Sequence, residues 1–173
     1  MKLIKLKLKH KHLLIEMIEE WEEDQKKNNT DTSPYAIFKN DCHKYFYYLK
    51  HLDNKSTKNG FVPSSVYFLY DEMRNKLIGA VDIRHYLNEN LMQTGGHIGD
   101  GIRPSERRKG YGTLIIKLAL EKCKELGIDK VLMFCDKSNI GSKKTIERNG
   151  GIFEQEVKEK NGNTLLKYWI PLK

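Results

Sequence analysis

The chain begins with alternating apolar and charged positions. In residues 1–9, MKLIKLKLK, leucines alternate with lysines, which is the period of a half-buried strand. From Leu13 to Asn29 the apolar residues return every three or four positions, as in an amphipathic helix. A second helix is expected over residues 33–52, because Pro34 fits the first turn of a helix.

The second expected helix is rich in aromatic residues. They are Tyr35, Phe38, Tyr45, Phe46, Tyr47 and Tyr48. We expect them to pack between helix and sheet, and the alternative is that they line a pocket or a dimer surface.

Three strand-like segments follow a polar loop at residues 53–60. Residues 65–71 and 75–87 are rich in β-branched and aromatic residues, and the expected turn between them is Asn75–Lys76. The third segment, residues 93–103, is rich in glycine and ends before a proline. This pattern predicts three consecutive strands.

A third helix is predicted from about Glu106 to Leu126, and Gly127 followed by Ile128 is typical of a helix C-terminus. The residues expected in its buried stripe are Leu114, Ile115, Leu118, Ala119, Cys123 and Leu126. The stripe places this helix against the sheet.

The last part of the chain alternates strand and helix signals. Residues 130–136 are typical of a buried strand, and residues 138–151 predict a short helix that ends at Gly150. Residues 152–172 predict two strands around the hairpin signal Asn161–Gly162. The element order is β-α-α-β-β-β-α-β-α-β-β, so we expect the α/β class, with one domain over residues 1–173 and a mixed sheet flanked by helices.

Charge narrows the range of partners. The net charge is +8 and the isoelectric point is about 9.2, which favours nucleic acid, membrane headgroups or a phosphorylated cofactor. The lysines are scattered among acidic residues and form no single stripe on a helix, which argues against a nucleic-acid-binding module. Scattered lysines that only solubilise the surface are the remaining alternative.

Composition also bears on the compartment. No stretch approaches the roughly 20 apolar residues that cross a bilayer, and the first residues lack the pattern of a secretory signal. Three widely spaced cysteines predict neither a disulfide framework nor a metal cluster. We therefore expect no membrane partner, no metal and a cytoplasmic location.

The hexapeptide RRKGYG, residues 107–112, lies directly before the apolar stripe of the third helix. The first turn of a helix has unpaired N–H groups and a partial positive charge, so it binds phosphate. Gly110 and Gly112 would let a phosphate approach the backbone, and Arg107, Arg108 and Lys109 would add charge.

Other glycine-rich phosphate sites fit less well. The chain lacks the GxxxxGK[ST] pattern of a P-loop, and a GxGxxG dinucleotide site would need glycine where Ile115 stands. A basic, solvated turn is the alternative that the hexapeptide alone leaves open.

Arg107-x-x-Gly110-x-Gly112 resembles the [QR]-x-x-G-x-[GA] pyrophosphate loop of the GNAT N-acetyltransferase family. The resemblance is close over residues 95–153, and GGHIGDGIRPSERRKGYG is similar to bacterial predicted acetyltransferases of undefined substrate. It implies a mostly antiparallel, twisted sheet in which two parallel strands, residues 97–103 and 130–136, splay apart to admit acetyl-CoA.

The resemblance assigns the following residues to the cofactor: Gly101, Ile102, Arg103, Arg107, Arg108, Lys109, Gly110, Tyr111, Gly112, Thr113, Asn139 and Ser142. Backbone groups of residues 101–103 are expected to pair with the pantetheine amides. Asn139, read without the family, is also a good helix N-cap.

The implied reaction is a direct attack of an amine on the thioester, which needs a base and can use an acid for the departing thiolate. Family members often place a tyrosine as that acid, but the matching position is Ile146. His97 and Asp100 are the candidate bases, and Asp82, Arg84 and His85 on the preceding strand are candidates for the acceptor pocket.

The sequence thus predicts an acetyl-CoA-dependent N-acetyltransferase that acts on a primary amine of a small molecule or peptide. The alternative functions are a catalytically silent acyl-CoA-binding domain and a basic nucleic-acid-binding module. The acceptor amine, the native acyl group and association into a homodimer are not determined by the sequence.

Overall fold

Strands and helices alternate in the order that the sequence predicts. The computed structural model describes residues 1–30 and 32–172. Its strands and α-helices are β1 (Lys2–Ile4), α1 (Lys11–Asn28), α2 (Tyr45–Lys50), β2 (Ser64–Asp71), β3 (Lys76–Arg84), β4 (Ile98–Ile102), α3 (Tyr111–Glu125), β5 (Lys130–Asp136), α4 (Ile140–Arg148), β6 (Ile152–Lys158) and β7 (Thr164–Pro171). In the described residues no helix has the length and apolarity needed to cross a bilayer.

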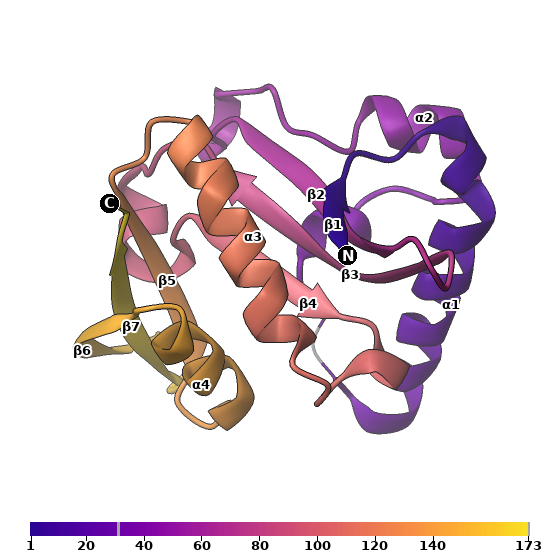
Figure 1. Ribbon diagram of the computed structural model, residues 1–173. Coiled ribbons are helices and arrows are strands. Elements are labelled where there is room, and N and C mark those ends of the chain that lie inside the picture. The colour runs from indigo at the N-terminus through magenta and orange to yellow at the C-terminus, as the bar shows by residue number, and fades with distance from the viewer. Residues whose placement is uncertain (31, 173) are drawn as a thin grey trace.

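The strands form two antiparallel sheets. The first has the order β1-β2-β3-β4 and the second the order β5-β7-β6, so β4 and β5 are facing edges (Figure 1). The two edges touch only near their beginnings, where the His97 amide donates to the Leu132 carbonyl at 2.8 Å and the Leu132 amide donates to His97 Nδ1 at 2.9 Å. Beyond that point the strands diverge, which confirms the expected splay.

Two apolar cores cover the two faces of β3. On one face Val81 and Ile83 pack with Ile115 and Ala119 of α3. On the other face Ala80 belongs to the core that includes α1. Because each fully buried aliphatic side chain contributes about 1.5–3 kcal/mol, these cores hold the central strands between the two helices.

The second expected helix is wrong as a single element. Residues 35–37 form one 3-10 turn, and α2 begins only at Tyr45. The Asp41 carboxylate accepts the His43 amide at 2.9 Å, a local bond that competes with helix formation. Of the aromatic residues, Tyr45 and Tyr48 are buried, Phe38 is partly buried, and Tyr35, Phe46 and Tyr47 are exposed.

Three further boundaries of strands and helices differ from those that the sequence predicts. The first strand stops at Ile4, because the Lys7 amide donates to His10 Nδ1 in a tight turn. The strand expected from residue 93 begins at Ile98, after a wide helical turn at 91–95. The third helix begins at Tyr111, since a 3-10 turn and the left-handed Gly110 precede it.

The C-terminal end of the third helix corrects one more expectation. Leu126 lies beyond the last residue of α3 and is exposed, so it is not part of the buried stripe. Ile116 and Leu120 are buried instead.

Gly99 and Gly101 of β4 give a matched test of this packing. A Cβ at Gly101 would overlap the Ser33 carbonyl oxygen, whereas a Cβ at Gly99 would lie 3.6 Å from the Arg84 guanidinium, an ordinary contact. We expect Gly101→Ala to lower the free energy of unfolding by about 2 kcal/mol or more, as overpacking does, and Gly99→Ala to change it by less than about 1 kcal/mol. Urea unfolding measures both, and equal losses would contradict the packing described.

Candidate active site

The start of α3 presents a run of unpaired backbone N–H groups. From Arg108 to Thr113 no amide donates to an acceptor within residues 1–30 and 32–172. Gly110 takes φ +85°, a left-handed conformation that favours glycine, and a Cβ there would meet no atom within 4 Å. These amides and the helix dipole point at one place, which is the arrangement that binds a phosphate group.

Carboxylates of α1 hold the segment before α3 in place. Glu20 accepts hydrogen bonds from the Arg103 guanidinium and, at 2.7 Å, from the Ser105 amide. Asp24 accepts a bond of 2.7 Å from the Arg107 guanidinium. Burial opposes ionisation of Glu20, but the bonds from Arg103 and Ser105 outweigh it and hold its pKa below the usual range.

A third carboxylate, Glu106, lies inside the segment. It is almost fully buried and pairs with Arg74, Lys76 and Lys109 at 3.0–3.1 Å. Burial works against ionisation of Glu106, but these three cations lower its pKa to about 2. The carboxylate is therefore ionised at neutral pH and ties the segment to the β2–β3 turn.

This network corrects the predicted roles of three cations. Arg103 is buried among Glu16, Glu20 and the Leu77 carbonyl. Arg107 and Lys109 are neutralised by Asp24 and Glu106. All three charges are thus already paired. Arg107 and Lys109 are not the mobile cations that the sequence predicts for a phosphate, and Arg103, which is predicted for a backbone contact to the coenzyme, instead binds α1 through its side chain.

A cleft of about 700 Å³ lies between the end of β4, the start of α3 and the start of α4. Figure 1 shows the first turns of α3 lying beside α4. The lining residues are Asp100, Gly101, Ile102, Glu106, Arg107, Arg108, Gly110, Gly112, Thr113, Ser138, Asn139, Ile140, Gly141, Ser142, Lys144, Thr145 and Arg148. The cleft therefore brings together most of the residues predicted for the cofactor.

Some predicted cofactor residues lie outside the lining and others were missed. The Tyr111 hydroxyl is 3.2 Å from the Arg74 guanidinium, which turns its side chain away from the cleft. Arg108, Lys144 and Arg148 are the lining cations that have no ion-pair partner in the described chain. Sequence analysis missed the last two, although their spacing of four residues on α4 places both on one helix face.

The glycine and polar residues of α3 and α4 fix the width of the cleft. A Cβ at Gly112 would come within 3.2 Å of the Thr145 hydroxyl, so this glycine allows the two helices to approach. Asn139 caps α4 by accepting the Ser142 amide at 3.0 Å. Asn149 donates to the Thr113 carbonyl at 3.2 Å and joins the helices at the other end of α4.

The free edge of β4 presents different amides from those predicted. The Arg103 amide donates to the Ile78 carbonyl of β3 at 2.9 Å, so it is not available. Because antiparallel pairing directs alternate residues to opposite edges, Asp100 and Ile102 direct their amides toward β5. The Ile102 carbonyl accepts a hydrogen bond of 3.1 Å from the Arg107 guanidinium. The Ile102 amide and the amide and carbonyl of Asp100 remain without a partner on this edge in the described residues.

The two candidate bases lie in different surroundings. The Asp100 side chain faces the cleft, and burial raises its pKa to about 6. His97 is buried, its Nδ1 accepts the Leu132 amide, and burial together with the Arg84 charge lowers its pKa to about 4. The basic nitrogen of His97 is thus occupied, and the ring bridges β4 and β5.

Ile146 is fully buried in the core beneath α4. Its position carries no polar group, so it supplies no acid to the cleft.

A second cavity, of about 550 Å³, lies on the opposite face of β3 and β4. Arg84 and Asp82 of β3 both line it. His85 points to the other face, where its Nε2 lies 2.9 Å from the Ser65 hydroxyl. The structure therefore does not bring His85 into this cavity.

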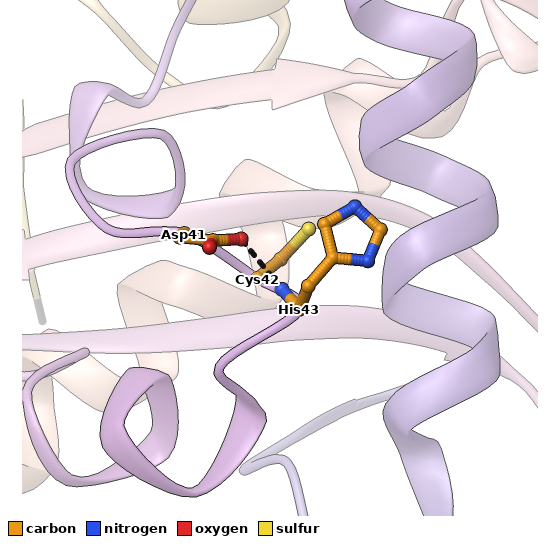
Figure 2. A group of neighbouring side chains, drawn as sticks. All are labelled: Asp41, Cys42 and His43. Atoms are coloured by element: carbon orange, nitrogen blue, oxygen red, sulfur yellow. Dashed lines mark hydrogen bonds between the residues drawn. The ribbon is translucent and has the colours of Figure 1, made fainter.

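Asp41, Cys42 and His43 are the one group of possible metal ligands that gather closely in residues 1–30 and 32–172. Figure 2 shows the Asp41 carboxylate bonded to the His43 amide. Burial and the neighbouring carboxylates raise the pKa of the Cys42 thiol, which keeps it protonated. The trio is therefore an incomplete set of ligands, and we assign no metal to it.

Solved structures share this fold. A ribosomal-protein-S5-alanine acetyltransferase from Vibrio fischeri superposes with a TM-score of 0.69 at 15% identity, over 98% of this chain and 91% of that chain. The microcin C7 self-immunity acetyltransferase MccE, solved with acetyl-CoA and AMP, gives 0.66 at 19% identity over 98% and 91%. A mutant of the spermidine N-acetyltransferase SpeG from Vibrio cholerae gives 0.63 at 17% identity over 99% and 95%.

At such identities the structures show the fold and not the substrate. Among proteins of curated function no sequence matches this chain. The model of the acetyltransferase (GNAT) domain family matches residues 8–152, which is most of the chain and includes the α3 segment, the cleft and α4. The chain belongs to the GNAT acetyltransferase family.

Proposed function

We propose that residues 1–173 form a single acetyltransferase domain that moves an acetyl group from acetyl-CoA to a primary amine of a small molecule or peptide. The observation that carries the proposal is the run of unpaired amides from Arg108 to Thr113, which opens onto the cleft. The structural neighbours support it, because SpeG is named for the acetylation of spermidine and MccE was solved with acetyl-CoA.

The residues of the cleft fit coenzyme A. Under this proposal the amides at the start of α3 hold the diphosphate, and Arg108, Lys144 and Arg148 add the charge-assisted bonds. The amides of Asp100 and Ile102 on the edge of β4 pair with the pantetheine arm. Asn139 and Ser142 border the same space at the start of α4. When bound, the coenzyme supplies an acetyl group activated as a thioester.

Asp100 is the ionisable group that faces the coenzyme side of β4. Its pKa of about 6 leaves part of the carboxyl protonated near neutrality, and a bound diphosphate would raise the pKa further by repulsion. We assign it the transfer of a proton to the departing sulfur, since a thiol has a pKa near 8.5 and accepts that proton readily. His97 has no role in proton transfer under this proposal.

A catalytically silent acyl-CoA-binding domain is the second candidate. Ile146, an apolar residue at the position where the family often has an acid, favours it. Both candidates bind acetyl-CoA, but only the enzyme releases CoA when amines are added. A panel of primary amines followed by CoA release distinguishes them: release with any amine supports the enzyme, and binding without release supports the silent domain.

The cations of α4 test the coenzyme site. We expect Lys144→Ala and Arg148→Ala each to raise the Kd of acetyl-CoA about tenfold, because a hydrogen bond to a charged group contributes about 1.5–3 kcal/mol. Lys143→Ala is the matched control, since Lys143 pairs with Glu147 and lies outside the cleft lining. Isothermal titration calorimetry measures all three, and equal effects at positions 143 and 144 would contradict the site.

The pH dependence of turnover tests Asp100. A proton donor must be protonated, so kcat is expected to fall as the pH rises through the pKa of Asp100, at or above about 6. Asp100→Asn should remove this falling limb and lower kcat by about a hundredfold, the lower end of general acid catalysis. The pH profiles of the wild type and of Asp100→Asn are measured with the same amine, so the ionisation of the amine affects both profiles equally and does not change their difference. An unchanged profile in Asp100→Asn would exclude the role.

A further inference from the structure

The cavity on the α1 side of β3 shares no lining residue with the coenzyme cleft. Its walls come from three segments: the turn at 35–39, the loop at 54–64 and the strand β3. Leu91 closes one end. With a volume of about 550 Å³ it falls in the range of small-molecule sites.

Asp82 is the unusual residue of this cavity. It is 8% exposed, and its Oδ1 is fully buried with no hydrogen-bond partner in the described residues. An unsatisfied buried acceptor typically costs about 1–3 kcal/mol, so a native structure that keeps one has a reason for it. Because the terminal torsion of aspartate is soft, either oxygen can turn toward a donor in the cavity.

Cations surround this carboxyl. Lys39 donates one bond to the Leu52 carbonyl at 3.0 Å and has further N–H groups to offer. Arg84 donates from Nη1 to the Gly95 and Gly96 carbonyls, and its Nε and Nη2 have no hydrogen-bond partner in the described residues. Lys58 adds a third positive charge at the exposed rim. The cavity therefore has three cations and one carboxyl.

The position of Asp82 relates the cavity to the coenzyme cleft. Asp82 of β3 lies opposite Gly99 of β4. Asp100 follows Gly99 on β4, and its side chain lies on the other face of the sheet. Gly99 has no side chain, and a Cβ there would meet only Arg84 and Pro34. The two carboxyls thus lie on opposite faces of the β3–β4 sheet, Asp82 in the cavity and Asp100 in the cleft.

We infer that this cavity is the acceptor site, that Asp82 binds the ammonium of the acceptor and takes its proton, and that Arg84 and Lys39 bind an oxyanion on the same molecule. The inference rests on the proposed function. It assigns the acceptor to the class of primary amines that carry a carboxylate or a phosphate. It excludes diamines and polyamines as preferred acceptors, because a second ammonium would meet the cations of the cavity.

The proton and electron balance is complete with the groups named. The ammonium N–H bond breaks and its proton goes to the Asp82 carboxylate. The freed lone pair forms the C–N bond with the acetyl carbon, and the C–S bond breaks with its electron pair on sulfur, which Asp100 protonates. The amide nitrogen loses a second proton to water. Asp82 then gives its proton to solvent and Asp100 takes one from solvent, which resets both carboxyls, so the net products are the acetylated amine, free CoA and one released proton.

Amines of matched length test the class of acceptor. We expect kcat/KM for 4-aminobutyrate or 3-aminopropyl phosphate to exceed that for butylamine at least tenfold, and butylamine to exceed putrescine. The ratio of kcat/KM for 4-aminobutyrate to that for 3-aminopropyl phosphate shows whether the site prefers a carboxylate or a phosphate. A higher kcat/KM for putrescine than for both oxyanion-bearing amines would overturn the inference.

Variants test the residues. Asp82→Asn should lower kcat at least a hundredfold with every amine, whereas Arg84→Gln and Lys39→Met should lower kcat/KM for the oxyanion-bearing amines about to the level of butylamine. Asp129→Asn, an exposed carboxylate outside both cavities, is the control and should behave as the wild type. Thermal stabilisation by acetyl-CoA, measured in each variant, shows that the variant is folded and binds the coenzyme.

The failures of the two proposals are distinguishable. If acetyl-CoA stabilises the protein but no oxyanion-bearing amine releases CoA, or if Asp82→Asn keeps wild-type kcat, the inference is wrong and the coenzyme site stands. If acetyl-CoA neither stabilises the protein nor yields CoA with any amine, the proposed function is wrong and the inference falls with it.

Discussion

The architecture of the candidate active site depends on how the carboxylates of Glu20, Asp24 and Glu106 bind the segment before α3. Each of them pairs with a cation of that segment, so the charges of Arg103, Arg107 and Lys109 are satisfied inside the protein. What the segment then presents to the cleft is its backbone together with the side chain of Arg108, which is unpaired within residues 1–30 and 32–172. Since backbone amides at a helix start cannot move away from a ligand, a site built from them is more rigid than one built from long basic side chains.

The paired strands β3 and β4 have a different space on each face of their sheet. One face opens on the cleft with Asp100, and the other opens on the cavity with Asp82 and Arg84. The His97–Leu132 bonds close the gap between β4 and β5 at one end, so the sheets diverge from a fixed point. In the proposed reaction, this geometry would separate a coenzyme side from an acceptor side, with Asp82 of β3 paired to Gly99, the residue before Asp100 on β4.

Much of the fold could be predicted because its signals are local. The element order, the stripe on α3 and the hairpin at Asn161–Gly162 follow from periodicity and turn residues. The second helix could not, because a single Asx bond at Asp41 ends a segment whose composition favours a helix. The place of RRKGYG at the cleft could be predicted because its glycines and the start of α3 are adjacent in sequence. The place of Asn139 could be predicted only from the family resemblance.

The side-chain partners could not be predicted, because they are distant in sequence. Arg107 and Asp24 are 83 residues apart, and no local pattern reveals that they pair. For the same reason Arg107 was predicted as a free cation, whereas Lys144 and Arg148, which face the cleft from another helix, were missed. Asp82 was predicted only as one of three residues that line the acceptor pocket. Its unsatisfied oxygen could not be predicted, since the missing partner of a buried oxygen is visible in three dimensions alone.

The most direct test of the account follows the backbone amides themselves. In a ¹⁵N–¹H correlation spectrum titrated with CoA, we expect the largest shifts at the amides of residues 108–113, with further shifts at Asp100 and Ile102. Shifts that cluster elsewhere, or a spectrum that saturating CoA leaves unchanged, would contradict the claim that the start of α3 binds the diphosphate.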